Sequence, residues 1–238
     1  MTRKEFFIQI CEYLHDFSPL NEFKFSASLN EFKLRFPGGW QSVNMAPTFW
    51  SFLDVFDISP YFDIRFDVAQ RWFEKFGYRD VKSQRADGLL DFEDFPPAFN
   101  SVKYEIDPNL FTQQNLLRIQ KMILDNTSTM CRKCYSLTSF FENFIIPVIE
   151  GNNEIGTEGN MEHLFYYSAI CWIVSPENFP LWKKKADSTA AFLTERMNNR
   201  RLEDPLWSSF AYRYDEIMDY LVHYDFSKEL ARLAPERR

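Results

Sequence analysis

A chain of 238 residues with 45% apolar and 18% aromatic side chains can bury a sizeable core, which excludes a globally disordered protein. Its formal net charge of −7 disfavours nucleic acid and anionic membrane as partners and favours a basic partner. With only 7 glycines and neither a GxGxxG nor a GxxxxGK motif, the sequence contains no glycine-rich phosphate loop.

Neither a secretion signal nor a membrane span is expected. Acidic residues interrupt the N-terminal segment where a signal peptide would need an apolar core. The most apolar later run, Phe165 to Val174, is about half of the roughly 20 residues that cross a bilayer. We therefore expect a cytoplasmic protein whose four cysteines are reduced thiols: Cys11, Cys131, Cys134 and Cys171.

The first part of the chain predicts one helix followed by strands. Apolar residues recur at three- and four-residue spacing over 2–17, which is typical of an amphipathic helix, and Ser18-Pro19 ends it. The alternation at 23–25 and 32–36 is typical of half-buried strands. The segments 20–24 and 29–33 both read Leu-Asn-Glu-Phe-Lys, and this repeat predicts two paired strands.

Further strands are predicted up to residue 68. A turn at Pro37-Gly38-Gly39 precedes a strand at 40–45, and another strand follows at 49–56. The clearest alternation covers 62–68 and predicts a strand with one apolar face and one charged, solvent-facing stripe. Helical spacing returns at 72–76, and 78–108 is expected to be an acidic connection with one strand at 102–106.

The second half of the sequence predicts helices. Asp107-Pro108 is a capping residue followed by proline, as are Ser175-Pro176 and Asp204-Pro205. Helices are expected at 110–124, 135–149, 161–174, 176–198 and 205–223, with a short helix at 227–233 before a charged tail. The expected fold class is α+β, with a mainly antiparallel sheet and flanking helices in 1–108 and a helical bundle in 109–238. One continuous domain is the alternative to two.

The pair Cys131 and Cys134 has the spacing of a zinc site or of a redox-active dithiol. A structural zinc site needs four ligands, but the sequence contains no second CxxC and no HxxxH. Cys171 and His163 could complete the site only by a tertiary coincidence. We expect two incidental thiols, no bound metal and no cofactor.

Two patterns leave other functions open. Glu22-Phe23-Lys24 and Glu31-Phe32-Lys33 each place an acid and a lysine on one strand face, as metal-dependent nucleases of the PD-(D/E)xK type do. Solvated strand faces explain them more simply, since the aspartates that could complete such a site follow these units. One basic concentration is expected to be solvated helix surface, with a nucleic-acid-associated factor as the alternative; it comprises Lys183, Lys184, Lys185, Arg196, Arg200 and Arg201.

The partner-binding surface is predicted in the acidic N-terminal half. Between Asp54 and Asp107 there are 12 acidic and 7 basic residues, the largest local excess in the chain. A charged strand face and a run of closely spaced acids can both meet a basic surface without burying unpaired charge. The residues expected to contact the partner are Asp63, Arg65, Asp67, Asp87, Asp91, Glu93 and Asp94.

The order of predicted elements resembles that of small bacterial α+β immunity and accessory proteins. The shared layout is a helix, an FKF strand, a second amphipathic strand, the strands around Trp40 and Trp50, an FDIRF strand and an apolar helical half. This resemblance implies an acidic, intracellular, non-catalytic protein that binds one partner, and it assigns no residue a role. The sequence thus predicts a non-enzymatic binding protein, of immunity or inhibitor type, for a basic protein.

Overall fold

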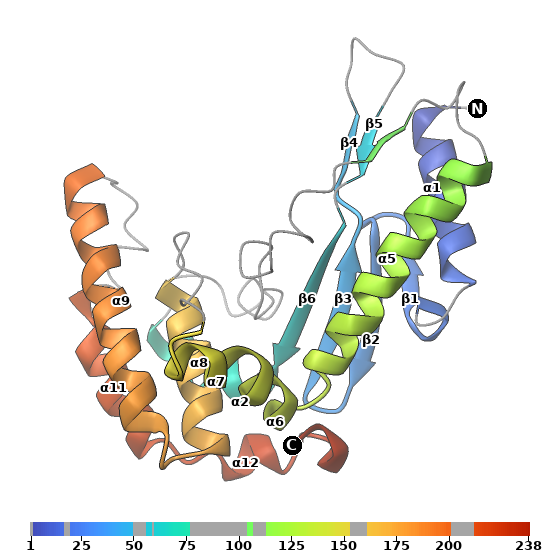
Figure 1. Cartoon of the computed structure of the whole chain (residues 1–238). Coiled ribbons are helices and arrows are strands. Elements are labelled where there is room, and N and C mark those ends of the chain that lie inside the picture. The colour runs from blue at the N-terminus through green and yellow to red at the C-terminus, as the bar shows by residue number, and fades with distance from the viewer. Residues whose placement is uncertain are drawn as a thin grey trace. The chain divides into compact units, whose positions relative to one another are not determined.

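The computed structural model describes residues 2–16, 20–49, 56–58, 60–76, 104–106, 113–152, 161–200 and 212–238. The fold is α+β, as expected, with a four-stranded antiparallel sheet in the N-terminal half and helices in the C-terminal half (Figure 1). Two compact units make up the chain. Unit 1 comprises 1–35, 40–64 and 90–132, and unit 2 comprises 36–39, 65–89 and 133–238, so the expected boundary at 108/109 lies inside unit 1.

Helix α1 (Arg3–His15) confirms the first predicted helix. Thr2 and Glu5 form a reciprocal capping box, in which the Glu5 carboxylate accepts from the Thr2 amide at 2.6 Å. This hydrogen bond lowers the pKa of Glu5. The inward face is apolar and packs in unit 1, where the Phe7 ring meets the rings of Phe49 and Phe56 edge-on.

The Leu-Asn-Glu-Phe-Lys repeat forms the hairpin that its spacing predicts. Strand β1 (Lys24–Ser26) pairs antiparallel with β2 (Glu31–Phe36), and Phe25 lies opposite Phe32. The two copies differ at their first residue: Leu20 is buried in the 3₁₀ turn η1 (Leu20–Glu22), whereas Leu29 lies in the hairpin turn and is 62% exposed.

Strands β3 (Gly39–Asn44) and β6 (Tyr61–Phe66) complete the four-stranded sheet, whose order is β1-β2-β3-β6. A second sheet has the order β4-β5-β7, with bounds Pro47–Phe49, Phe56–Ile58 and Tyr104–Ile106, and both of its pairings are antiparallel. Of the strand expected at 49–56, only Phe49 and Phe56 are described, and they lie opposite each other in β4 and β5; residues 50–55 lie outside the described residues.

Two glycines are required where the chain turns from β2 into β3. Gly38 has a φ of +82°, a conformation that residues with a Cβ rarely adopt. A Cβ on Gly39 would lie 2.1 Å from the carbonyl oxygen of Arg65, so only glycine permits this close backbone approach. The predicted turn is confirmed, and the close approach of Arg65 on β6 requires glycine at position 39.

Helices account for all regular structure in the described parts of 113–223, which confirms the helical second half. Helix α5 (Gln113–Lys133) belongs to unit 1. In unit 2, the short helix α2 (Asp67–Gln70) and the 3₁₀ segment η2 (Arg71–Phe76) follow β6 directly. The helices α8 (Met161–Val174), α9 (Phe179–Arg200), α11 (Tyr214–His223) and α12 (Ser227–Leu230) come later in the chain. None of the helices in the described ranges is both long and apolar enough to cross a membrane.

The helix expected at 135–149 runs without a gap over 137–149, with a π-helical segment before its proline. It consists of α6 (Leu137–Phe140), a π-helical turn η4 (Phe141–Ile145) and α7 (Ile146–Ile149). Pro147 has no N–H, and its ring would clash with the carbonyl four residues earlier. The preceding amide, that of Ile146, donates to the Phe141 oxygen, so the backbone bonds shift to the wider π spacing at this point.

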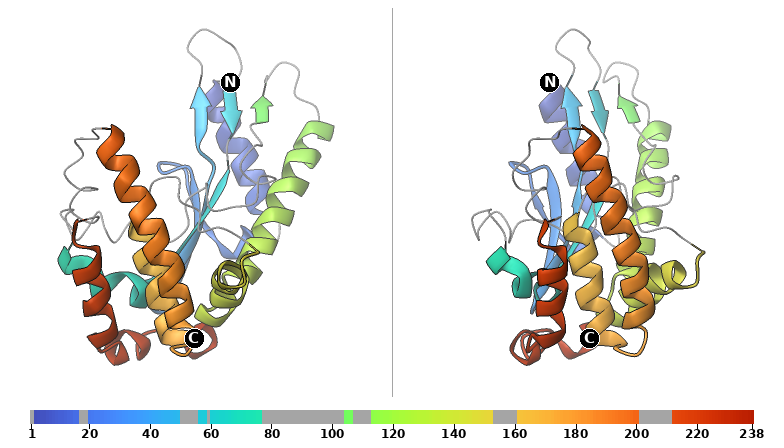
Figure 2. Two further views of the ribbon diagram at one scale, coloured as in Figure 1. Left: turned by 60° about the vertical axis from the view of Figure 1, so that its left-hand side comes forward. Right: turned by 90° about the vertical axis from the view of Figure 1, so that its left-hand side faces the viewer.

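Helix α8 forms the core of unit 2. Every residue from His163 to Cys171 is buried, and α8 packs against both α9 and α11 (Figure 2). The Phe165 ring contacts the rings of Phe73 from η2 and Tyr214 from α11. Such a helix, apolar on all sides, requires neighbours on all sides.

The charged tail expected after residue 233 is instead packed, which corrects that prediction. The Arg237 guanidinium lies 4.4 Å from the centre of the Phe36 ring and 4.2 Å from that of Tyr135. Its Nη1 donates to the Tyr135 carbonyl at 2.9 Å. The Thr138 amide donates to the Arg238 carbonyl at 3.0 Å, so residues 234–238 are part of unit 2.

Candidate functional site

The charged stripe expected on strand β6 is not a solvent-facing surface. Arg65 is 2% exposed, and Phe62, Ile64 and Phe66 on the opposite face are fully buried. The expectation was wrong because alternating charge marks an exposed face only where nothing covers the sheet, and here both faces of the strand hold buried side chains. Asp63 is partly exposed and lies on β6, whereas Asp67 begins α2.

Asp67 neutralises two arginines. Its Oδ1 accepts from Arg65 Nε at 2.9 Å, and its Oδ2 lies 2.8 Å from Arg71 Nη2. A buried guanidinium without a carboxylate partner is costly, so this pair satisfies the charge that β6 carries inward. Arg65 and Asp67 therefore have structural contacts within unit 2, and their expected contact with a partner stays a prediction.

The other four acids of the predicted surface, Asp87, Asp91, Glu93 and Asp94, lie outside the described residues. Their expected contact with a partner stays a prediction. Three of the seven residues expected to contact a partner are described: Asp63, Arg65 and Asp67. Arg65 and Asp67 form the ion pairs given above, whereas Asp63 is partly exposed and takes no part in them.

Three of the four cysteines are buried, and none forms a disulfide. Burial raises the pKa of the Cys11 thiol far above its ordinary value and that of Cys171 to about 12, so both are protonated and poor nucleophiles at neutral pH. Cys131 is partly exposed at the end of α5, and Cys134 follows that helix in the turn before α6. Over the described ranges, no three His, Cys, Asp or Glu side chains come together in a way that could hold a metal ion.

The two acid–lysine pairs do not form equivalent strand faces. Glu22 lies in η1, outside β1, whereas Glu31 and Lys33 both lie on β2 and form an ion pair of 3.4 Å. The Lys33 ammonium also lies 4.0 Å from the centre of the Trp40 ring. Lys33 thus has structural contacts, and the repeat reflects hairpin pairing.

Helix α9 carries five of the six residues in the basic concentration that the sequence singled out, and Arg201 lies outside the described residues. The helix begins later than expected, because Pro176 to Asn178 form a turn in which Asn178 Nδ2 donates to Ser175 Oγ at 2.8 Å. The Ser175 hydroxyl donates to Glu177, and this bond lowers the pKa of Glu177. The helix then runs from Phe179 to Arg200.

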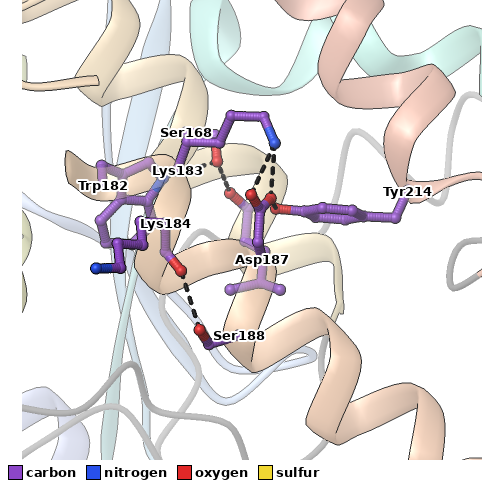
Figure 3. Close-up of polar contacts among 8 residues, drawn as sticks. Ser168, Trp182, Lys183, Lys184, Asp187, Ser188 and Tyr214 are labelled. Atoms are coloured by element: carbon purple, nitrogen blue, oxygen red, sulfur yellow. Dashed lines mark hydrogen bonds and ion pairs between the residues drawn. The ribbon is translucent and has the colours of Figure 1, made fainter. Parts of the chain in front are cut away.

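The inner face of α9 is fixed by burial. Trp182 is fully buried, and its indole Nε1 donates to Ser168 Oγ on α8 at 2.8 Å (Figure 3). The Ser168 hydroxyl donates in turn to the Leu164 carbonyl. The other buried residues recur at three- and four-residue spacing along this face: Phe179, Ala186, Ala190 and Leu193.

A polar cluster at the flank of α9 joins it to α11. Lys183 Nζ lies 2.8 Å from both carboxylate oxygens of Asp187, and the Tyr214 hydroxyl donates to Asp187 Oδ1 at 3.0 Å (Figure 3). Burial raises the pKa of the Tyr214 hydroxyl well above its ordinary value, and the Asp187 carboxylate raises it further. Tyr214 is therefore a neutral donor that fixes α11 against α9.

The outer face of α9 is exposed and mixes large apolar with basic side chains. Leu181 is 56% exposed and Phe192 is 55% exposed. Lys184 and Lys185 are exposed between them, and no ion pair of either lysine occurs among the residues that the structure describes. We call Leu181, Lys184, Lys185, Ser188, Ala191 and Phe192 the α9 outer face.

Sequence reasoning identified the lysines of this face but missed its apolar residues. Leu181 and Phe192 are eleven residues apart, about three helical turns, and so they project from the same side of α9. The sequence did contain a signal for them, because Leu181 and Phe192 interrupt the polar face of the predicted helix.

Comparison with models of known protein families, with curated proteins and with solved structures finds no match.

We expect Asp67→Asn to lower the free energy of unfolding by about 3 kcal/mol, because it removes the negative charge that pairs with the buried Arg65 guanidinium. Urea unfolding monitored by circular dichroism measures this change. Asp125→Asn, at an exposed position on α5, is the control and should change stability by less than about 0.5 kcal/mol. Equal effects of the two substitutions would show that the ion pair contributes no stability.

We expect Tyr214→Phe to lower the free energy of unfolding at pH 7 by about 1 kcal/mol through loss of the hydrogen bond to Asp187. The folded-state pKa of Tyr214 is raised above its ordinary value of 10.0, so its contribution is complete below pH 10 and decreases as the pH rises further. The gap between the wild type and the variant should therefore narrow between pH 9 and pH 11.

Urea unfolding at pH 7, 9 and 11 tests this pH dependence. Tyr212→Phe is the control, since Tyr212 is 74% exposed. A gap between the wild type and Tyr214→Phe that stays constant over this range would contradict the assignment of Tyr214 as a buried neutral donor.

Proposed function

We propose that this protein is a non-enzymatic binding protein whose partner is another protein. The observation that carries the proposal is the α9 outer face, on which Leu181 and Phe192 are more than half exposed on one side of a helix whose other side is already buried. Exposed apolar side chains that share a face with polar and charged residues are typical of protein interaction sites. An immunity or inhibitor role, in which binding blocks the partner's own surface, is the form that the layout resemblance implies.

The rival function was a metal-dependent nuclease or a nucleic-acid-associated factor. Binding is the better supported of the two for two reasons. The position of Glu22 outside β1 leaves a single acid–lysine pair on a strand, at Glu31 and Lys33. The net charge of −7 opposes association with a polyanion.

The charge of the partner differs between the two candidate surfaces. The chain as a whole is acidic, which supports a basic partner for the segment Asp87 to Asp94. The α9 outer face is locally basic and favours an acidic one. The two surfaces can be tested separately, because one set of substitutions changes acids and the other changes α9.

We expect Leu181→Ser with Phe192→Ser to abolish co-purification of the native partner, because the substitutions remove the exposed apolar contact area of α9. Quantitative mass spectrometry of material purified from the native cell identifies the partner, and calorimetry with purified proteins confirms it. Leu29→Ser is the matched control, since Leu29 is an equally exposed leucine in the β1–β2 turn. An unchanged partner set in the double variant would refute the proposal for α9.

We expect neutralisation of Asp91, Glu93 and Asp94 together to slow association with a basic partner and to flatten its salt dependence, because charge complementarity acts mainly on the association rate. Stopped-flow association at several salt concentrations measures both effects. Unchanged kinetics in this variant, together with loss of binding on charge reversal of Arg200 and Arg201, would place the partner on the α9 side of the chain.

A further inference from the structure

We propose that the α9 outer face binds an acidic amphipathic helix of the partner protein. This inference rests on the proposed binding function and adds the chemistry of the segment that is bound. It follows from the spacing of Leu181 and Phe192, from the positive charge of the lysines between them and from the burial of the opposite face of α9.

The spacing favours a helix as the bound segment. Leu181 and Phe192 are separated by about 16 Å along the axis of α9, at a rise of 1.5 Å per residue. A second helix that packs alongside presents its own residues at the same repeat, so apolar side chains about three turns apart on it can contact both. Ser188 and Ala191 are small residues on the same face, and they allow close approach between the two contacts.

The charge favours an acidic segment. Lys184 and Lys185 lie between the two apolar residues, and within the described part of the chain neither forms an ion pair. Lys183 is engaged by Asp187, and the one exposed acid on this side of the helix, Glu195, lies beyond Phe192. A partner helix with acidic residues between two apolar ones would match this pattern along its length.

A protein helix fits this surface better than a membrane does. Helices that lie in a membrane interface have a continuous apolar face, whereas here two lysines and a serine separate Leu181 from Phe192. The net charge of −7 also repels anionic lipid. A second copy of this chain is the nearest other occupant, because α11 exposes Asp215 and Asp219.

The test is selection of binders to the full chain from a phage-displayed library of helical peptides. We expect the enriched peptides to carry apolar residues about eleven positions apart with Asp or Glu between them. Fluorescence anisotropy with the synthetic peptide should show binding at least tenfold weaker to Lys184→Glu with Lys185→Glu. A peptide whose acids are replaced by lysine should bind this variant more tightly than the wild type.

Lys4→Glu with Lys121→Glu is the matched control, because it makes the same charge change at two exposed lysines of unit 1. It should leave the peptide affinity within about twofold. Circular dichroism and thermal unfolding establish that each variant is folded, which exposed substitutions should not alter.

Several outcomes would overturn the inference. They are the absence of enriched peptides, enrichment of basic peptides, and peptides that bind Leu181→Ser with Phe192→Ser as tightly as the wild type. Binding of vesicles of phosphatidylserine and phosphatidylcholine that depends on Lys184 and Lys185 would assign the face to a membrane. A dimer in light scattering that Lys184→Glu with Lys185→Glu dissociates would assign it to a second copy.

The failure of this inference can be told apart from failure of the binding function. If the native partner depends on Leu181 and Phe192 but the selected peptides are not acidic helices, the binding function stands and the helix inference fails. If acidic peptides bind at α9 but the native partner binds Leu181→Ser with Phe192→Ser as well as it binds the wild type, the binding function assigned to this face fails.

Discussion

The burial of helix α8 on all sides is the constraint on which the arrangement of unit 2 depends. A helix that is apolar around its whole circumference is stable only if neighbouring elements cover each side. The Ser168 hydroxyl in the buried stretch accepts a hydrogen bond from Trp182 of α9 and donates to the carbonyl of Leu164. This bond sets the rotation of α9 about its own axis, since Trp182 can reach Ser168 only when the face from Phe179 to Leu193 points inward.

The same rotation determines which residues of α9 are left outside. Leu181 and Phe192 project from the opposite side and contribute little to the core, so packing within the chain does not explain why they are large and apolar. A single exposed leucine such as Leu29 is common on protein surfaces and needs no explanation. Two large apolar residues about three turns apart, with two lysines between them that form no ion pair among the described residues, make a patterned surface, which distinguishes this face from a single exposed side chain.

Local periodicity was enough to predict most elements but not what covers them. The bounds of α8 follow directly from the apolar run that ends at Ser175-Pro176, and the hairpin follows from the Leu-Asn-Glu-Phe-Lys repeat. Arg65 shows the limit, because alternation along β6 defines two faces without revealing that both are covered. The π-helical turn before Pro147 and the packing of Arg237 between two rings were equally out of reach, since each depends on tertiary contacts or on a backbone shift that hydropathy does not encode.

The net charge of the chain likewise does not show which charged side chains are available to a partner. The net charge of −7 counts Asp67 as an acid available to a partner, yet its carboxylate is occupied by Arg65 and Arg71. Lys184 and Lys185, by contrast, have no acidic partner among the described residues. Exposed charges are screened over about 8 Å at physiological ionic strength, so a segment docking on α9 responds to the lysines it touches more than to the average of the whole chain. An acidic protein can therefore present a basic site, and the sign of the partner's charge has to be argued from the surface that it meets.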